Sequence, residues 1–173
     1  FNGNALIKKA QEGVKVRLIY DDLGSWHLKR SSIREMKKAG IRLFSFFKIR
    51  FPFFTTKLNY RNHRKIVIID GKVGYLGGFN IADEYINEKE LFGHWKDTAI
   101  MVKGEAVKSF TIMFLQMWDV TEKSEEDYEK YINDIEYEND LHLKEEGYMI
   151  PFGDSPMDRE NVGELVYMDI INK

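Results

Sequence analysis

Apolar and polar residues follow two different periods along this chain. In some segments apolar side chains recur every three or four positions, which is typical of a helix packed on one face, and in others they alternate as in a strand. The order of these segments predicts an α/β fold with a mixed, partly parallel β-sheet flanked by helices. The pattern predicts helices over residues 4–12, 32–39, 82–89, 105–119 and from about 159, and strands over 14–20, 41–46, 66–69, 73–76, 98–102 and 147–152.

Local signals set some of the expected boundaries. Gly13 and Gly40 follow the first two helices, at the position where glycine is favoured. Ser32 and Glu35 have the spacing of a capping box, which predicts that the second helix opens there. Residues 66–69 are a continuous β-branched run, as expected of a central strand covered on both faces, and a turn at Asp70-Gly71 returns the chain as a hairpin.

Composition narrows the class of protein. The chain has 173 residues, 43% of them hydrophobic, which is enough for one core and too little for two full α/β domains. It has no cysteine, which excludes disulfides and thiolate metal sites and favours a reducing compartment. The sequence contains no apolar run of membrane-spanning length and no secretory signal, so a soluble chain is expected.

Charge is distributed unevenly although the net charge is only −2. Nine basic residues and no acidic ones lie between Glu35 and Asp70, which favours an anionic ligand there. Residues 121–147 carry eleven acids and three lysines, a composition expected of a solvated excursion, part helix and part loop. The four histidines have no metal-ligand spacing, so no metal site is expected.

The candidate chemistry begins at His63. His63 and Lys65 are two residues apart in a segment expected to be extended, so their side chains emerge on one face. A potential nucleophile or proton carrier beside a fixed positive charge suits an anionic phosphate ester. Asp70 and Asn80 follow, the latter after the glycine pair Gly77-Gly78. The residues by themselves indicate phosphodiester chemistry and no particular substrate.

This spacing resembles the phospholipase D superfamily signature, which reads His-x-Lys, four residues, Asp, six residues, Gly-(Ser or Gly)-x-Asn. The flanking residues are similar to bacterial cardiolipin synthase, and the similarity runs along nearly the whole chain. They are Gly3-Asn4-Ala5-Leu6, Val16 to Ser25, Asn59-Tyr60-Arg61-Asn62, Gly77 to Ile81 followed by Asp83-Glu84-Tyr85, and His94-Trp95-Lys96-Asp97-Thr98.

The resemblance implies a metal-free and cofactor-free transfer through a phosphohistidine. His63 would attack phosphorus, and Asp70 would support a motif histidine. Lys65 and Asn80 would donate to the phosphate oxygens, with Gly77 and Gly78 allowing close backbone approach. His94 and Asp97 are possible pocket residues, although a surface position for His94 and a structural role for Asp97 are equally open. The expected reaction joins two phosphatidylglycerol molecules into cardiolipin and glycerol.

The resemblance also implies a chain that is truncated at both ends. Residues 1–153 would be the first catalytic half without its leading strand, and residues 154–173 the start of the second half. The second histidine would come from that second half of the parent chain, or from a homodimer. The parent would lie at the cell membrane with its catalytic domain on the cytoplasmic side, and the isolated fragment would be inactive.

Two other interpretations stay open. A phospholipase D-like phosphodiesterase or nuclease would use the basic stretch for a nucleic-acid backbone, but the flanking residues disfavour a nucleic-acid partner. The other interpretation is a non-catalytic fragment that binds phosphate. Residues 44–54 mix aromatic and basic side chains, and they either contact a lipid surface or pack as a strand and loop.

Overall fold

The computed structural model divides into two compact units, each described here by itself. The first comprises Phe1–Lys65, Gly78–Thr98 and Trp118–Ser124, and the second comprises Ile66–Gly77, Ala99–Met117 and Glu125–Lys173. The structure describes residues 3–46, 48, 61–91, 93–125, 127–133, 135–137, 148–154 and 159–173.

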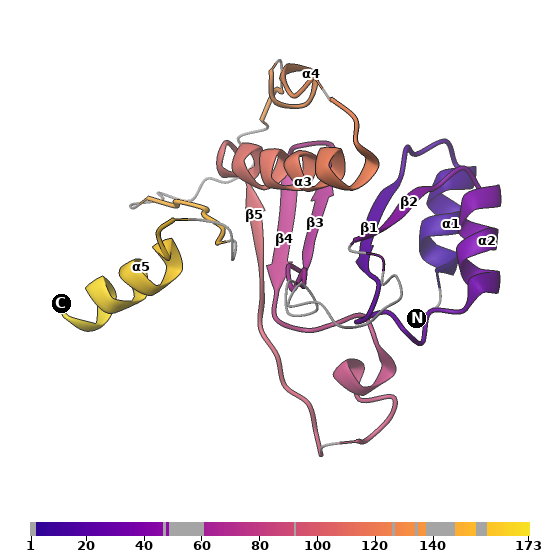
Figure 1. Ribbon diagram of the computed structural model, residues 1–173, viewed down its shortest axis with the longest axis horizontal. Helices are drawn as coiled ribbons and strands as arrows, with labels where there is room; N and C mark the ends of the chain where they lie inside the picture. The colour runs from indigo at the N-terminus through magenta and orange to yellow at the C-terminus, as the bar shows by residue number, and fades with distance from the viewer. Residues whose placement is uncertain are drawn as a thin grey trace. The chain divides into compact units, whose positions relative to one another are not determined.

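The first unit is built on two parallel strands, β1 (Arg17–Asp21) and β2 (Arg42–Phe46), joined through helix α2 (Arg30–Lys38). Helix α1 (Asn4–Gln11) precedes β1 and lies beside α2 against this pair of strands (Figure 1). The predicted β–α–β order and parallel pairing are therefore confirmed, although β1 begins three residues later than expected. Both helices end as predicted, with Gly13 at φ 96° and Gly40 at φ 89°.

The core of this unit forms between the two helices and the sheet. Met36, Ile41 and Leu43 are buried, and residues of α1 and β1 pack around them. The predicted start of α2 is wrong, because the helix begins at Arg30 and has no side-chain cap. Leu28 and Ile33 pack against the same cluster, with the spacing of a hydrophobic staple. Apolar burial on both sides of the first turn thus sets the start of the helix.

Trp118 forms a second packed cluster in the first unit. Its ring is fully buried, and Phe44 meets it edge-on at 5.0 Å. The guanidinium groups of Arg17 and Arg42 each lie 5.1 Å from the ring centroid. Arg42 Nη2 donates to both carboxylate oxygens of Glu122, at 2.7 and 2.6 Å, and this hydrogen bonding lowers the pKa of Glu122. Phe44 is therefore half-buried against Trp118, and residues 47 and 49–54 of the proposed lipid-contacting segment lie outside the described residues.

The second unit is an antiparallel sheet in the order β3 (Ile66–Ile69), β4 (Val73–Gly77), β5 (Ala99–Lys103). It is covered by helix α3 (Ala106–Glu122), of which the part up to Met117 belongs to this unit (Figure 1). Val102, Val107 and Phe110 form its buried core. The predicted hairpin is confirmed. The expected α/β fold is present, with its parallel and antiparallel strands in separate sheets among the described residues.

Some expected elements differ from the structure. Within the described part of the chain β3 pairs with β4 alone, and Val67 and Ile69 are about half exposed, so the expectation of a central covered strand is wrong. The expected helix over 82–89 is a single 3₁₀ turn, η2 (Asp83–Ile86), and residues 148–152 form no strand. The acidic segment contains α4 (Glu129–Ile132), and the last helix is α5 (Val162–Ile171).

No helix among the described residues is both long and apolar enough to cross a membrane.

Candidate active site

His63 and Lys65 lie together in the extended segment that leads into β3. Lys65 Nζ is 3.2 Å from His63 Nδ1 and donates to the His63 carbonyl oxygen at 2.7 Å. His63 is exposed and Lys65 is half-buried. Burial lowers the pKa of the Lys65 ammonium, and the negative charge of Asp97 partly opposes that shift. The structure therefore brings the imidazole and the ammonium into direct contact, close to a carboxylate.

Asp21, at the end of β1, holds the segment that carries these two residues. Its Oδ2 accepts a hydrogen bond from the backbone N–H of Asn62 at 3.2 Å, and its Oδ1 lies 3.7 Å from Arg61 Nη1. The Arg61 and Asp21 side chains are 14% and 11% exposed, so this ion pair is largely removed from water. Asp21 is a positioning residue that sequence reasoning did not single out. A carboxylate directly after the run Leu18-Ile19-Tyr20 was the available signal.

Asp97 is fixed by its own neighbours. Its Oδ1 accepts from the Thr98 backbone N–H at 2.7 Å, and its Oδ2 accepts from Trp95 Nε1 at 3.2 Å. A Cβ atom built at Gly78 would lie only 2.7 Å from Asp97 Oδ1. Gly78 thus leaves the space that this carboxylate fills, a more specific reason for glycine than the expected approach of phosphate.

Asn80 belongs to a scaffold of aromatic and amide side chains. Its Nδ2 donates to Tyr85 Oη at 2.9 Å, and the Tyr85 ring packs edge-on against Trp95 at 4.7 Å. Asn87, with φ 60°, accepts from the Trp95 backbone N–H at 2.6 Å and donates to the Trp95 carbonyl at 2.9 Å. The scaffold connects Asn80 to the Trp95 indole that holds Asp97. Sequence reasoning did not identify Tyr85 or Asn87, because only the fold brings them to this position.

The remaining predicted residues are placed as follows. Asp70 lies in the β3–β4 turn with φ 52°. It directly follows the last residue of β3, whereas Lys65 directly precedes the first residue of that strand. Gly77 is the last residue of β4, paired with Ala99. His94 is exposed. Asp70 and Gly77 belong to the second unit and His63, Lys65 and Asn80 to the first, so their cooperation stays a prediction. The pocket role of His94 stays a prediction too.

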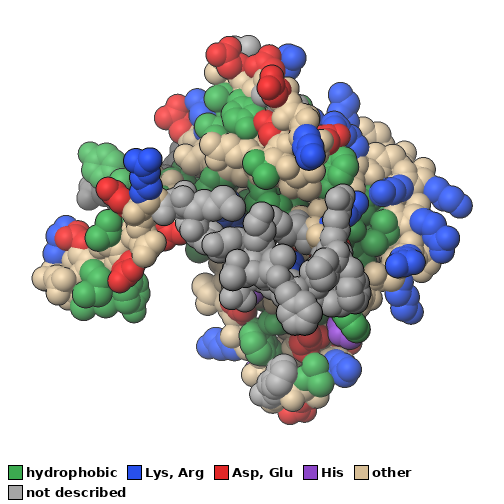
Figure 2. All heavy atoms as spheres, viewed as in Figure 1, with side chains coloured by type: hydrophobic (Ala, Val, Ile, Leu, Met, Phe, Trp, Pro, Cys, Tyr) green, Lys and Arg blue, Asp and Glu red, His purple; other side chains and the backbone are tan. Residues whose placement is uncertain are grey.

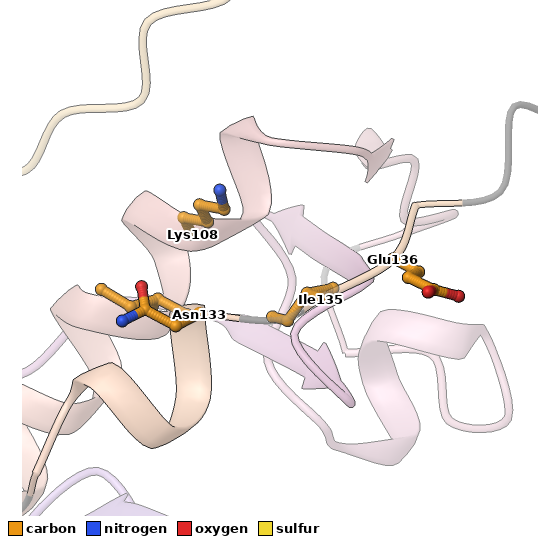
Figure 3. Close-up of a pocket in the computed structure, with 5 residues that line it drawn as sticks. Lys108, Asn133, Ile135 and Glu136 are labelled. Atoms are coloured by element: carbon orange, nitrogen blue, oxygen red, sulfur yellow. The ribbon is translucent and has the colours of Figure 1, made fainter.

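A hollow in the second unit lies between α3 and the segment after α4 (Figure 3). It measures about 580 Å³ and is lined by Lys108, Ile132, Asn133, Ile135 and Glu136. Lys108 Nζ lies 3.6 Å from Glu105 Oε1 and 5.7 Å from the Tyr137 ring centroid, so its charge already has partners. None of the predicted site residues lines this hollow. No group of three or more His, Asp or Glu side chains within the described ranges is placed to hold a metal ion.

Comparison with known proteins gives consistent matches over the part of the chain that carries this site. A family model described as "Cardiolipin synthase, PLD-like domain" matches residues 3–118. The chain is 49% identical over 171 residues to an uncharacterized protein of Streptococcus mutans, which covers 97% of the chain and 35% of that protein. It is 51% identical over 113 residues to cardiolipin synthase of Alkalihalophilus pseudofirmus and to cardiolipin synthase 2 of Bacillus cereus. Each of these two matches covers 65% of the chain and 22% of the relative.

Proposed function

Because the chain belongs to the cardiolipin synthase family of phospholipase D-like domains, we propose that it forms the first catalytic half of a phosphatidyltransferase. The reaction joins two phosphatidylglycerol molecules into cardiolipin and releases glycerol. The observation that carries the proposal is the 3.2 Å contact between Lys65 Nζ and His63 Nδ1 beside the Asp97 carboxylate. The similarity to cardiolipin synthases supports the substrate class.

In the first step, Nε2 of His63 attacks the phosphorus of one phosphatidylglycerol. The bond from phosphorus to the glycerol headgroup breaks, and glycerol leaves after accepting a proton from a second histidine. In the second step, a hydroxyl of another phosphatidylglycerol attacks the phosphorus of the phosphohistidine and gives its proton to the same second histidine. The bond between phosphorus and His63 Nε2 breaks, which releases the imidazole. Lys65 and Asn80 donate to the non-bridging oxygens, where negative charge develops.

The Lys65 contact supports one tautomer of the His63 imidazole. An ammonium group can only donate hydrogen bonds, so its contact with Nδ1 suits a neutral ring that carries its proton on Nε2. Attack by Nε2 requires the other tautomer. When a phosphodiester oxygen accepts the hydrogen bond from Lys65 Nζ instead, His63 Nδ1 is free to carry the ring proton. Substrate binding and activation of the nucleophile are coupled in this way.

The second histidine comes from outside these 173 residues, which contain one His-x-Lys motif with the matching Asp and Asn. We place it in the second half of a longer parent chain, of which residues 154–173 form the start, or in a second copy of this chain. The chain spans 22% of the length of its cardiolipin synthase relatives, which leaves room for such a half. The membrane location of the parent belongs to the same proposal.

A chimera tests the proposal. The chain replaces the matching region of the A. pseudofirmus relative, and the purified protein is incubated separately with phosphatidylglycerol vesicles and with plasmid DNA. We expect cardiolipin and glycerol as products, with no transfer in His63→Ala and unchanged transfer in a His27→Ala control. A folded chimera that nicks DNA and makes no lipid product contradicts the proposal. So does a His63→Ala chimera that keeps full activity.

A further inference from the structure

The outward faces of α1 and α2 carry a concentration of positive charge. Residues 3–46 contain ten basic and four acidic side chains, although the whole chain is net negative. Figure 2 shows Lys and Arg side chains gathered over these two helices. The helices bury Ile33 and Met36 toward the sheet, which leaves the cations in solvent. The exposed basic residues of this face are Lys8, Lys9, Arg30, Arg34, Lys37 and Lys38.

Two large apolar side chains project from the loop that enters α2. Trp26 is 78% exposed and Leu23 is 45% exposed. The loop is an ordered turn, because the Trp26 N–H donates to the Leu23 carbonyl and the Leu28 N–H donates to the Ser25 carbonyl. Leu28 packs into the core, so the loop is fastened to the fold while Trp26 is presented to solvent. Tryptophan and leucine side chains exposed to this degree are available to contact an apolar partner.

We propose that this basic face, with Trp26 and Leu23 at its edge, docks on an anionic phospholipid bilayer. The cations match the negative surface potential of such a bilayer, and tryptophan is favoured where the headgroups meet the acyl chains. A nucleic acid would also attract the cations, and Trp26 could stack on a base. Leu23 gains nothing from base stacking but is stabilised by hydrocarbon, so the pair of side chains favours lipid.

Asp21 connects the docking loop to the catalytic segment. Its Oδ1 accepts from the Gly24 backbone N–H at 2.8 Å, inside the Trp26 loop, while its Oδ2 accepts from the Asn62 N–H, next to His63. One carboxylate therefore fixes the base of the loop and the approach to the proposed nucleophile. Docking through Trp26 holds the His63 segment near the membrane surface, where a phospholipid headgroup is presented.

The test measures binding of the 173-residue chain to phosphatidylglycerol-containing vesicles and to pure phosphatidylcholine vesicles by flotation. The charge variant is the double substitution Arg30→Glu and Arg34→Glu. A glutamate suits the first turn of a helix, and one four residues before Lys38 forms a favourable pair, so α2 is expected to fold. The matched control is Lys72→Glu with Lys103→Glu, the same change in net charge at two exposed positions of the second unit.

We expect binding to anionic vesicles only, weakened about tenfold or more by the α2 double variant, by Trp26→Ser and by added salt. The control variant and His63→Ala should bind like the unchanged chain. Trp26 fluorescence should shift to shorter wavelength with anionic vesicles, a change absent in Trp26→Phe. If the control and α2 variants lose vesicle binding equally, the proposed docking face is wrong. It is also wrong if the chain binds DNA and does not bind vesicles. Because His63 is not required for docking, such failure leaves the proposed transfer reaction intact.

Discussion

Two clusters in the first unit each combine a tryptophan, a carboxylate and a cation, yet they differ in how the charges are satisfied. Around Trp118, Arg42 donates to both oxygens of Glu122, so cation and anion are matched to each other. In the candidate site, the Asp97 carboxylate is held by Trp95 and a backbone N–H, whereas Lys65 Nζ contacts the ring and the carbonyl oxygen of His63. A phosphate oxygen can replace those contacts without disturbing the fold.

The comparison teaches how the same residue types serve stability or binding. Within the first unit, Arg42 contacts the buried Trp118 ring and pairs with Glu122, so it serves packing. Lysine, a compact and mobile point charge, leaves its donors exchangeable. The negative charge of Asp97 partly opposes the lowering of the Lys65 pKa by burial. The predictions below separate these two roles.

Replacing Lys65 with Ala should have the largest effect on transfer. Loss of a positioned donor to the phosphate should lower kcat of the chimera roughly 10²–10³-fold. The midpoint of thermal unfolding should hardly change, because no buried pair is broken. Kinetics and calorimetry on the same sample check this, with Lys72→Ala as the exposed control. A normal kcat in the Lys65→Ala chimera would mean that Lys65 does not take part in the proposed reaction.

Replacing Trp118 with Ala should have the largest effect on stability. The fully buried ring packs against Phe44 and two guanidinium groups, so its loss should lower the free energy of unfolding by about 3–5 kcal/mol. Denaturant unfolding of the 173-residue chain measures this, with Trp26→Ala as the matched exposed control. If both tryptophan variants unfold alike, the Trp118 cluster has no special structural role.

Substituting Gly78 with Ala should disturb Asp97. The new Cβ would meet Asp97 Oδ1 at 2.7 Å, so we expect about 1–3 kcal/mol of destabilisation from overpacking. In an Asp97→Ala background the same change should cost less, because the obstructing carboxylate is gone. A double-mutant cycle measures this coupling. If the two changes in the free energy of unfolding are strictly additive, Gly78 does not make room for the Asp97 side chain.

Asp97→Asn should produce the smallest change, a shift in pH dependence. Burial already lowers the pKa of Lys65, and Asp97 raises it, so removing this negative charge should lower the Lys65 pKa further. The ammonium then deprotonates at lower pH, and the alkaline limb of the transfer profile should move to lower pH. Asp83→Asn, at another exposed acidic position, is the control. An alkaline limb that stays at the same pH would mean that Asp97 does not influence the pKa of Lys65.

Periodicity predicted most elements because amphipathic spacing follows directly from how each element packs. It failed at the start of α2, where Leu28 and Ile33 outweigh a capping box, and at β3, where a β-branched run does not imply cover on both faces. The contact between His63 and Lys65 was predictable because they are two positions apart in extended chain, which puts both side chains on one face. Asp21 and Tyr85 were not, since their partners are distant in sequence or depend on loop geometry.

The most direct test of the central claim is the ¹⁵N NMR signal of the His63 imidazole, assigned by its loss in His63→Ala. It is measured at a pH where the ring is neutral, with and without short-chain phosphatidylglycerol below its micelle-forming concentration. The account predicts a proton on Nε2 in the free chain and on Nδ1 in the complex, with no such change in Lys65→Ala. An unchanged tautomer on lipid binding, or the same change without Lys65, would contradict it.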